Sequence, residues 1–351
     1  MDSAILDKKA YIPALIGAAV SLLLLRSGLL SFFFLVPMGF IACRHEYRIA
    51  WAASLFAILG NMVMSFRTAS SHGVPLAATT WNLLFFTAMV LIFAWITVPP
   101  PDFAERVPLS IRFVTGSCFG ALVFIAFFLR LLASPWFPEY VANLVNTLAS
   151  QNALFEIIST ETFLQGMKNV ILRGGSLVTC VFMFALCRQL SFILALLIPR
   201  KKRKVEGANS EETGSAGRNS LQMSFQKINS LMAFRVHPTL IWVFSSSLPL
   251  VVLTRMAGLE IPEIILWNVL VLCVILYLAQ GLGILQFFLS RTTVSPFLRL
   301  LFLVFLFILL FSPLLNMILL TGFVLLGIAE NWVPFRVPKQ NSPPSTPESG
   351  Q

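Results

Sequence analysis

The sequence predicts an all-α polytopic bundle of about ten membrane spans, several of them short. Of the 351 residues, 57% are hydrophobic and only 11% are charged, whereas an ordinary soluble domain carries about 25% charged residues. Apolar runs of about 17 to 25 residues, the length that crosses a bilayer core, recur along the chain. With so little polar surface, most of the chain must face lipid or other spans.

Six apolar runs are each suited to a single span. They occupy residues 49–66, 76–98, 113–132, 175–198, 240–256 and 264–289. Two further regions pose a choice between one span and two. Residues 11–43 are interrupted around Arg26, and residues 296–329 are interrupted around Pro313. Counting both regions as two spans each gives ten.

The distribution of basic residues supports this count. Five consecutive cations, Arg200 to Lys204, follow the run 175–198. Such a cluster resists translocation and stays in the cytoplasm, where it can meet anionic lipid. With ten spans and both termini inside, 18 of the 25 Lys and Arg residues face the cytoplasm. Merging only the first pair of spans would place Arg44 and Arg48 outside and break the bias.

This topology divides the chain into four parts. They are an N-terminal membrane half (1–198), a basic then polar cytoplasmic loop (199–238), a C-terminal membrane half (239–336) and a Pro- and Ser-rich tail expected to be disordered (337–351). The outer loop at 134–174 has apolar residues at helical spacing, and Thr162 and Gln165 have the spacing of a capping box. We expect amphipathic helices there, which either rest at the lipid interface or cover the bundle.

The sequence contains no catalytic or metal-binding pattern. It has no HExxH and no GxxxxGK[ST] motif, no CxxC pair among its five cysteines, and no metal-ligand spacing among its three histidines. By this topology its 15 acidic residues all fall in loops, tails or at span edges, where they do not supply an intramembrane carboxylate. We therefore expect a protein that is not an enzyme and has no cofactor, metal or nucleic-acid partner. Any energy from ATP would come from another subunit.

Arg188 is the most costly residue in the predicted spans. It lies near the middle of the run 175–198, where a charge costs at least about 2.5–3.5 kcal/mol. It should face the bundle interior, where its planar guanidinium suits a carboxylate or phosphate. The candidate ligand-binding residues are Arg188, its neighbour Gln189, and the intramembrane amides Asn82, Asn268 and Gln280. In the structural alternative, Arg188 bonds to backbone carbonyls or to amides such as Asn61.

Small residues line one face of the first predicted span. Ala10, Ala14 and Ala18 recur at intervals of four, which places them on one helix face and lets another helix approach closely. Two explanations remain open. The face packs within the chain, or it docks on another membrane subunit.

The final third combines several features. It contains Trp267 and Asn268, the run Gln-Gly-Leu-Gly at 280–283, and the closing segment LGIAENWVPFR at 326–336. In these residues the chain resembles the YybS-like family of bacterial membrane proteins over roughly residues 238–336. Members end the last span in a Gly, an acidic residue, an aromatic residue and a Phe-Arg pair. Glu330 stands where the family more often has Asp.

That family is in turn distantly similar to the substrate-binding subunits of energy-coupling-factor transporters. Those subunits capture a vitamin or related metabolite and dock on a partner through small residues of the first span. The resemblance therefore implies a docking role for Ala10, Ala14 and Ala18. The ten spans of this chain exceed the usual six.

Together these features favour a non-catalytic protein of the bacterial inner membrane with both termini in the cytoplasm. Its expected partners are the lipid bilayer, other membrane subunits and a small anionic metabolite. The leading hypothesis is the substrate-binding subunit of an uptake system that a partner energises. The alternative is a membrane scaffold or assembly protein of the cell envelope. A polar cavity reaching Arg188 would favour uptake, and a solid, dry bundle would favour the scaffold.

The topology predicts opposite labelling of two positions by a membrane-impermeant thiol reagent. In a background without the native cysteines, Ser150→Cys should label in intact cells because it lies in the outer loop. Ser210→Cys should label only after the membrane is opened. Labelling of Ser210→Cys in intact cells would invalidate the orientation.

Overall fold

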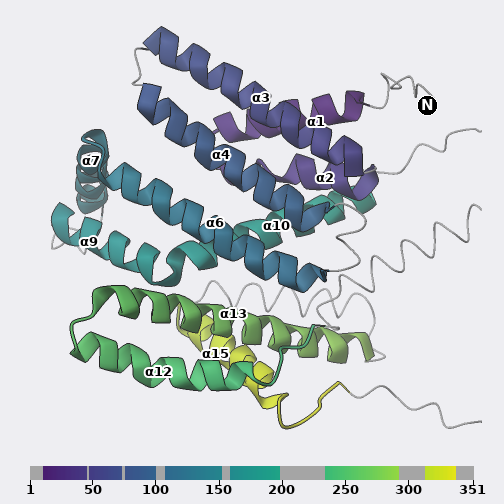
Figure 1. The fold of residues 1–351 in the computed structure, drawn as a ribbon, viewed down its shortest axis with the longest axis vertical. Coiled ribbons are helices and arrows are strands. Elements are labelled where there is room, and N and C mark those ends of the chain that lie inside the picture. The colour runs from purple at the N-terminus through teal and green to yellow at the C-terminus, as the bar shows by residue number, and fades with distance from the viewer. Residues whose placement is uncertain are drawn as a thin grey trace, which may run out of the picture. The chain divides into compact units, whose positions relative to one another are not determined.

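The computed structural model confirms the all-α architecture (Figure 1). It describes residues 11–45, 47–72, 76–99, 107–151, 159–197, 234–291 and 313–336, and within these ranges nearly every residue is helical and no strand occurs. The elements are α1 (Ile12–Arg26), η2 (Leu29–Phe33), α2 (Val36–Arg44), α3 (Tyr47–His72), α4 (Leu76–Thr97), α6 (Leu109–Leu132), α7 (Trp136–Gln151), α9 (Thr160–Val170), η3 (Ile171–Gly175), α10 (Ser176–Leu197), α12 (Leu240–Met256), α13 (Glu260–Arg291) and α15 (Pro313–Ala329).

The helices agree with the predicted spans. Each of the six single runs coincides with one helix, namely α3, α4, α6, α10, α12 and α13. In the described part of the chain, five helices are long and apolar enough to cross a membrane: Tyr47–Ser71, Thr79–Thr97, Leu109–Leu132, Thr160–Ala195 and Glu260–Leu289. Shorter apolar helices cover Ile12–Arg26, Leu30–Arg44, Leu240–Met256 and Leu315–Ala329. The chain is thus a membrane protein built as a helical bundle.

The first interrupted region forms a short hairpin. The chain breaks at Gly28, whose φ of 69° lies in the left-handed region that favours glycine, and α2 then packs against α1. The 15 residues of α1 extend about 22 Å, less than the bilayer core of about 30 Å. In the second interrupted region α15 begins at Pro313, as expected. The predicted span before it lies outside the described residues.

The chain divides into two compact units. Unit 1 comprises Met1–Gly207 with Thr254–Val271, and unit 2 comprises Ala208–Leu253 with Leu272–Gln351. The boundary between the units falls within α13, so its first turns group with the N-terminal helices. The predicted division into membrane halves stays a prediction. Most of the loop predicted at 199–238, and the tail at 337–351, lie outside the described residues.

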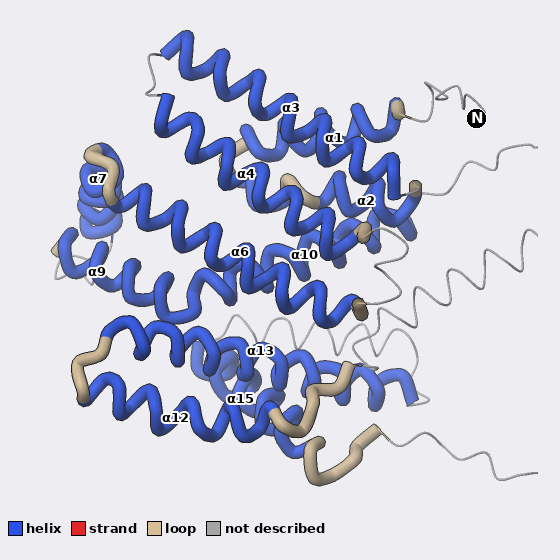
Figure 2. The backbone as a smooth tube through the Cα atoms, in the orientation of Figure 1, coloured by secondary structure: helices blue, strands red, loops and turns tan. Residues whose placement is uncertain are grey.

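The helices of unit 1 pack as a closed ring. In order of contact the ring runs α1, α3, α4, α6, α10 and α2, and α2 packs back against α1. Figure 2 shows α3, α4 and α6 as neighbouring long helices, with α7 and α9 gathered at one end. Since α2 also contacts α3 and α4, the short α1–α2 hairpin is held on several sides.

Side chains of unit 1 donate to carbonyl oxygens on the segment that follows the hairpin break. The Ser21 hydroxyl donates to the Phe34 carbonyl oxygen. The Ser191 hydroxyl on α10 donates to the Val36 carbonyl oxygen at 2.8 Å, and the Cys187 thiol lies 3.5 Å from a carbonyl oxygen of η2. Irregular backbone is tolerated at membrane depth only where the protein satisfies its polar groups. These hydrogen bonds therefore stabilise the break in unit 1.

A second irregularity joins the outer helices to α10. The π-helical turn η3 includes Gly174, with φ of 113°, a conformation that disfavours residues with a Cβ. The first turns of α13 pack on this turn. The Glu263 carboxylate lies 3.3 Å from the Arg173 guanidinium, and the Asn268 amide donates to the Leu172 carbonyl oxygen at 2.7 Å.

The predicted capping box in the outer segment is wrong. Helix α9 begins three residues earlier than the box requires, and its N-cap is Ser159, whose hydroxyl accepts a hydrogen bond from the Thr162 backbone N–H at 3.2 Å. Thr162 is already inside the helix and cannot cap it. The expected helices α7 and α9 are present. Their place at the lipid interface or over the bundle stays a prediction.

In unit 2, α13 and α15 approach closely at two glycines. A Cβ on Gly281 would overlap the Phe323 carbonyl oxygen, and one on Gly327 would overlap the Tyr277 carbonyl oxygen. The backbones can meet this closely only because neither residue has a side chain. The Gln280 amide joins the contact, donating to the Gly327 carbonyl oxygen at 3.1 Å.

The small-residue face of α1 packs inside unit 1. Ala14 is fully buried and Ala18 is 3% exposed. Ala14 clusters with Ile41 of α2 and Ala53 of α3. Ala10 lies outside the described residues. For the two alanines that are described, the packing corresponds to the intramolecular alternative, and subunit docking by this face stays an untested prediction.

Ala14→Leu should lower the melting temperature of the purified protein. The added atoms have no free space, and overpacking typically costs about 1–3 kcal/mol. Ala19→Leu is a matched control, because Ala19 is exposed on the same helix and the same atoms are added there. Thermal unfolding followed by circular dichroism in detergent would compare them. Equal melting temperatures would contradict the tight packing of this face.

Candidate ligand-binding site

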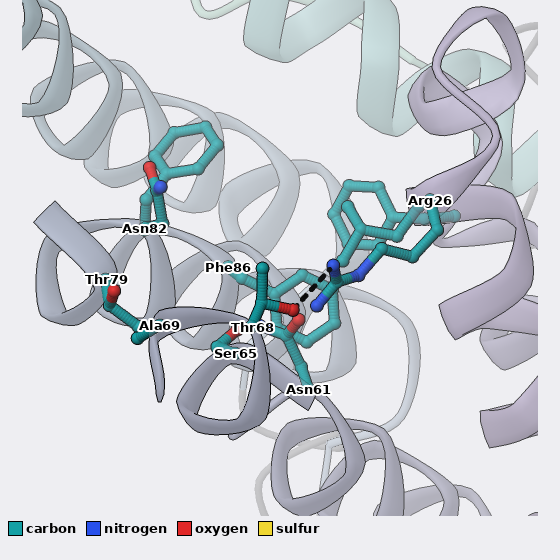
Figure 3. Close-up of a pocket in the computed structure, with 11 residues that line it drawn as sticks. Arg26, Asn61, Ser65, Thr68, Ala69, Thr79, Asn82 and Phe86 are labelled. Atoms are coloured by element: carbon teal, nitrogen blue, oxygen red, sulfur yellow. Dashed lines mark hydrogen bonds between the residues drawn. The ribbon is translucent and has the colours of Figure 1, made fainter. Parts of the chain in front are cut away.

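Unit 1 contains a cavity of about 410 Å³, within the range of small-molecule sites of about 300–1,000 Å³. It lies where the end of α1 and the segment before α2 face α3 and α4 (Figure 3). Its lining residues are Leu25, Arg26, Phe34, Asn61, Ser65, Thr68, Ala69, Thr79, Asn82, Phe85 and Phe86.

Two polar helix faces meet at this cavity. Asn61, Ser65 and Thr68 lie on one face of α3, because residues three and four apart are neighbours on a helix surface. Thr79 and Asn82 have the same relation on α4. Since α3 and α4 pack against each other, these faces line a common space within otherwise apolar helices.

The inner wall of the cavity is buried. Asn61 and Phe34 are each 5% exposed and Phe86 is 3% exposed, and the Phe34 and Phe86 ring centroids are 5.2 Å apart. The Asn61 amide makes no hydrogen bond with any residue that the structure describes. Its amide atoms are not among the fully buried unpaired polar atoms of the described residues. They open onto the cavity and can bond to what the cavity holds, either water or a ligand.

The rim of the cavity carries the charge. The Arg26 side chain is exposed, and its guanidinium donates one long hydrogen bond, 3.5 Å, to the Thr68 hydroxyl (Figure 3). No carboxylate of the described residues forms an ion pair with it. Arg26 thus remains available for further hydrogen bonds and for a negative charge.

The predicted ligand-binding residues are distributed over both units, with Gln280 in unit 2 and the others in unit 1. Arg188, on α10, lies within electrostatic range of Cys43 and Arg112 and does not line the cavity. Gln189 is exposed. Of the predicted set, only Asn82 lines the cavity.

The other two predicted amides make backbone hydrogen bonds. Asn268 donates to the Leu172 carbonyl oxygen of η3 and, at 2.9 Å, to the Ile264 carbonyl oxygen of its own helix. Gln280 is 2% exposed. Besides its bond to Gly327, it accepts from the Val236 backbone N–H at 2.8 Å. These contacts join elements within a unit, and a ligand-binding role for either amide stays a prediction.

Most of the cavity was not predicted from the sequence. Arg26 was expected only to mark a break between spans, and Asn61 only to be a partner for Arg188. The sequence does contain a pattern that indicates this cavity. Polar residues lie at positions 61, 65 and 68 of one apolar run and at positions 79 and 82 of the next. Each spacing places the residues on one helix face, and adjacent runs pack together.

The closing motif of the chain forms a buried ion pair in unit 2. The Arg336 Nε donates to the Glu330 carboxylate at 2.7 Å, and its Nη2 donates to the other carboxylate oxygen. Both side chains are buried. The Arg336 carbonyl oxygen accepts from the Arg235 guanidinium at 3.0 Å. A bidentate pair of this kind gives geometric specificity, so the motif fixes how the chain leaves α15.

Unit 2 also contains a cavity of about 730 Å³ near the start of α12 and the end of α15. None of its nine lining residues is charged. Trp242 and Trp332, which line it, are 74% and 68% exposed, as is typical of aromatic residues at a membrane–water interface. Among the described residues there is no group of His, Cys, Asp and Glu that could hold a metal.

Comparison with known proteins gives one match. A family described as "predicted membrane protein (DUF2232)" matches residues 217–324. The match covers less than a third of the chain and supports relationship to an uncharacterised family of membrane proteins. The resemblance to YybS-like proteins and to energy-coupling-factor subunits stays a prediction. No curated protein and no solved structure matches the chain.

Glu330→Gln should destabilise the protein. The substitution leaves the buried Arg336 guanidinium without its counter-charge, and breaking a buried pair in this way costs about 3–5 kcal/mol. Glu260→Gln is the matched control, because Glu260 is exposed in the first turn of α13, and it should melt close to wild type. Melting temperatures in detergent measure both. A Glu330→Gln protein as stable as the control would contradict a structural role for the pair.

Proposed function

We propose that the protein is a non-catalytic, ligand-binding membrane subunit that holds a small molecule in the cavity between α1, α3 and α4. The observation that carries the proposal is the Asn61 amide, which opens onto the cavity from a largely buried residue and has no hydrogen-bond partner among the described residues. A bound small molecule would supply that bond and would also explain the polar faces of α3 and α4.

An uptake role is consistent with this site. By the charge bias of the sequence, Arg26 and the connection between α3 and α4 face the outside, so the cavity receives its ligand from there. The sequence has no phosphate-binding loop of its own. A partner subunit therefore supplies the energy for transport, and the bacterial inner membrane is the proposed location.

The proposal is tested by asking what the purified protein retains. The wild-type protein, isolated in mild detergent, should yield a stoichiometric small molecule when denatured and analysed by mass spectrometry. Asn61→Leu should lose that molecule, because leucine has similar volume and no hydrogen-bonding group. Its melting temperature should remain close to that of the ligand-free protein.

Asn143→Leu provides the control for the same chemical change elsewhere. Asn143 is exposed on α7 and does not line the cavity, so this variant should retain the molecule. Equal retention by Asn61→Leu and Asn143→Leu would refute the site. A wild-type protein with no retained molecule would favour the alternative of a membrane scaffold or assembly protein.

A further inference from the structure

We infer that the cavity of unit 1 selects anions, and that Arg26 is the residue that selects them. This inference rests on the proposed ligand-binding function and adds the class of ligand: a small molecule with one anionic group and an apolar or ring-shaped body. The anionic group is a carboxylate, phosphate or sulfonate, which share the oxygen acceptors that a guanidinium recognises.

The residues that line the cavity indicate the charge of the ligand. Of the eleven residues that line the cavity, Arg26 alone is charged. Its single hydrogen bond to a neutral hydroxyl, at 3.5 Å, uses one of its five N–H donors. An exposed arginine next to a cavity lined largely by apolar atoms attracts anions more strongly than one in open solvent, because the effective dielectric constant is lower there.

The shape of the ligand follows from the arrangement of polar and apolar groups. The charged Arg26 side chain and the Asn82 amide lie at the rim of the cavity, where both residues are exposed. The Phe34 and Phe86 rings and the Asn61 amide form the buried wall. A ligand that fits places its anionic group at the rim and its apolar body against the rings. One polar atom of that body bonds to Asn61.

The geometry of α3 provides a direct test. Ser65 lines the cavity one turn before Thr68, the residue that Arg26 contacts. In a protein whose five native cysteines are replaced, Ser65→Cys places a thiol in the cavity with little change in volume. Its rate of modification then reports which reagents enter.

Two reagents of similar size and opposite charge make the comparison. They are the methanethiosulfonates bearing a sulfonatoethyl group and a trimethylammonioethyl group. After each rate is divided by the rate with a free thiol in solution, the anionic reagent should react at least about tenfold faster, a factor equivalent to about 1.4 kcal/mol. Raised salt should reduce the preference, because it screens exposed charges.

Combining Ser65→Cys with Arg26→Gln should abolish the preference. Combining it with Arg67→Gln should leave the preference in place, because Arg67 is exposed on α3 and does not line the cavity. The Arg67 variant removes the same charge from the same side of the protein. An equal loss in both variants would assign the effect to general surface charge and overturn the role of Arg26.

The outcomes separate the two proposals. Equal rates for both reagents with an open, reactive thiol would refute anion selection and leave the ligand-binding function standing. A thiol that reacts with neither reagent, in protein of normal melting temperature, would show that the cavity is closed to small molecules and would refute both. Faster reaction with the cation would likewise overturn the inference.

Discussion

The need to satisfy every backbone polar group inside an apolar environment organises this protein. A helix interrupted at membrane depth releases carbonyl groups, and each unpaired one is costly. At the interruption between α1 and α2, Ser21 and Ser191 donate to carbonyl oxygens of residues 34 and 36, which follow the break. The interruption also ends α1 at Arg26 and places Phe34 beside it, so the same feature that must be stabilised also shapes the cavity.

Both units use side chains that reach backbone carbonyls across helices, as Asn268 does in unit 1 and Gln280 does in unit 2. Unit 2 adds close backbone contact at Gly281 and Gly327 and the buried pair of Glu330 and Arg336. At the cavity wall, Asn61 makes no such bond to a backbone carbonyl. Gln280 makes one, and this difference is why the proposed site is built on Asn61.

Sequence reasoning was successful where length and periodicity decide the structure. Apolar runs located every long helix that the structure describes, and the break near Arg26 was correctly placed. The roles of individual polar side chains were harder to predict. Burying an amide such as Asn268 or Asn82 in a span costs the same free energy whether the amide bonds to a carbonyl group or to a ligand. Only the rotation and neighbours of each helix separate the two, and these depend on contacts far apart in the chain. The Ser159 cap was missed for a local reason, since the start of α9 was set three residues too late.

The shortness of α1 has a consequence for the surrounding lipid. A helix about 22 Å long cannot match an acyl layer about 30 Å thick, and a bilayer responds to such mismatch by thinning locally. Such thinning at the end of α1 would bring headgroups and water toward Arg26. A charged solute approaching the cavity would cross less hydrocarbon than at any neighbouring long helix, so the membrane itself would form part of the entrance.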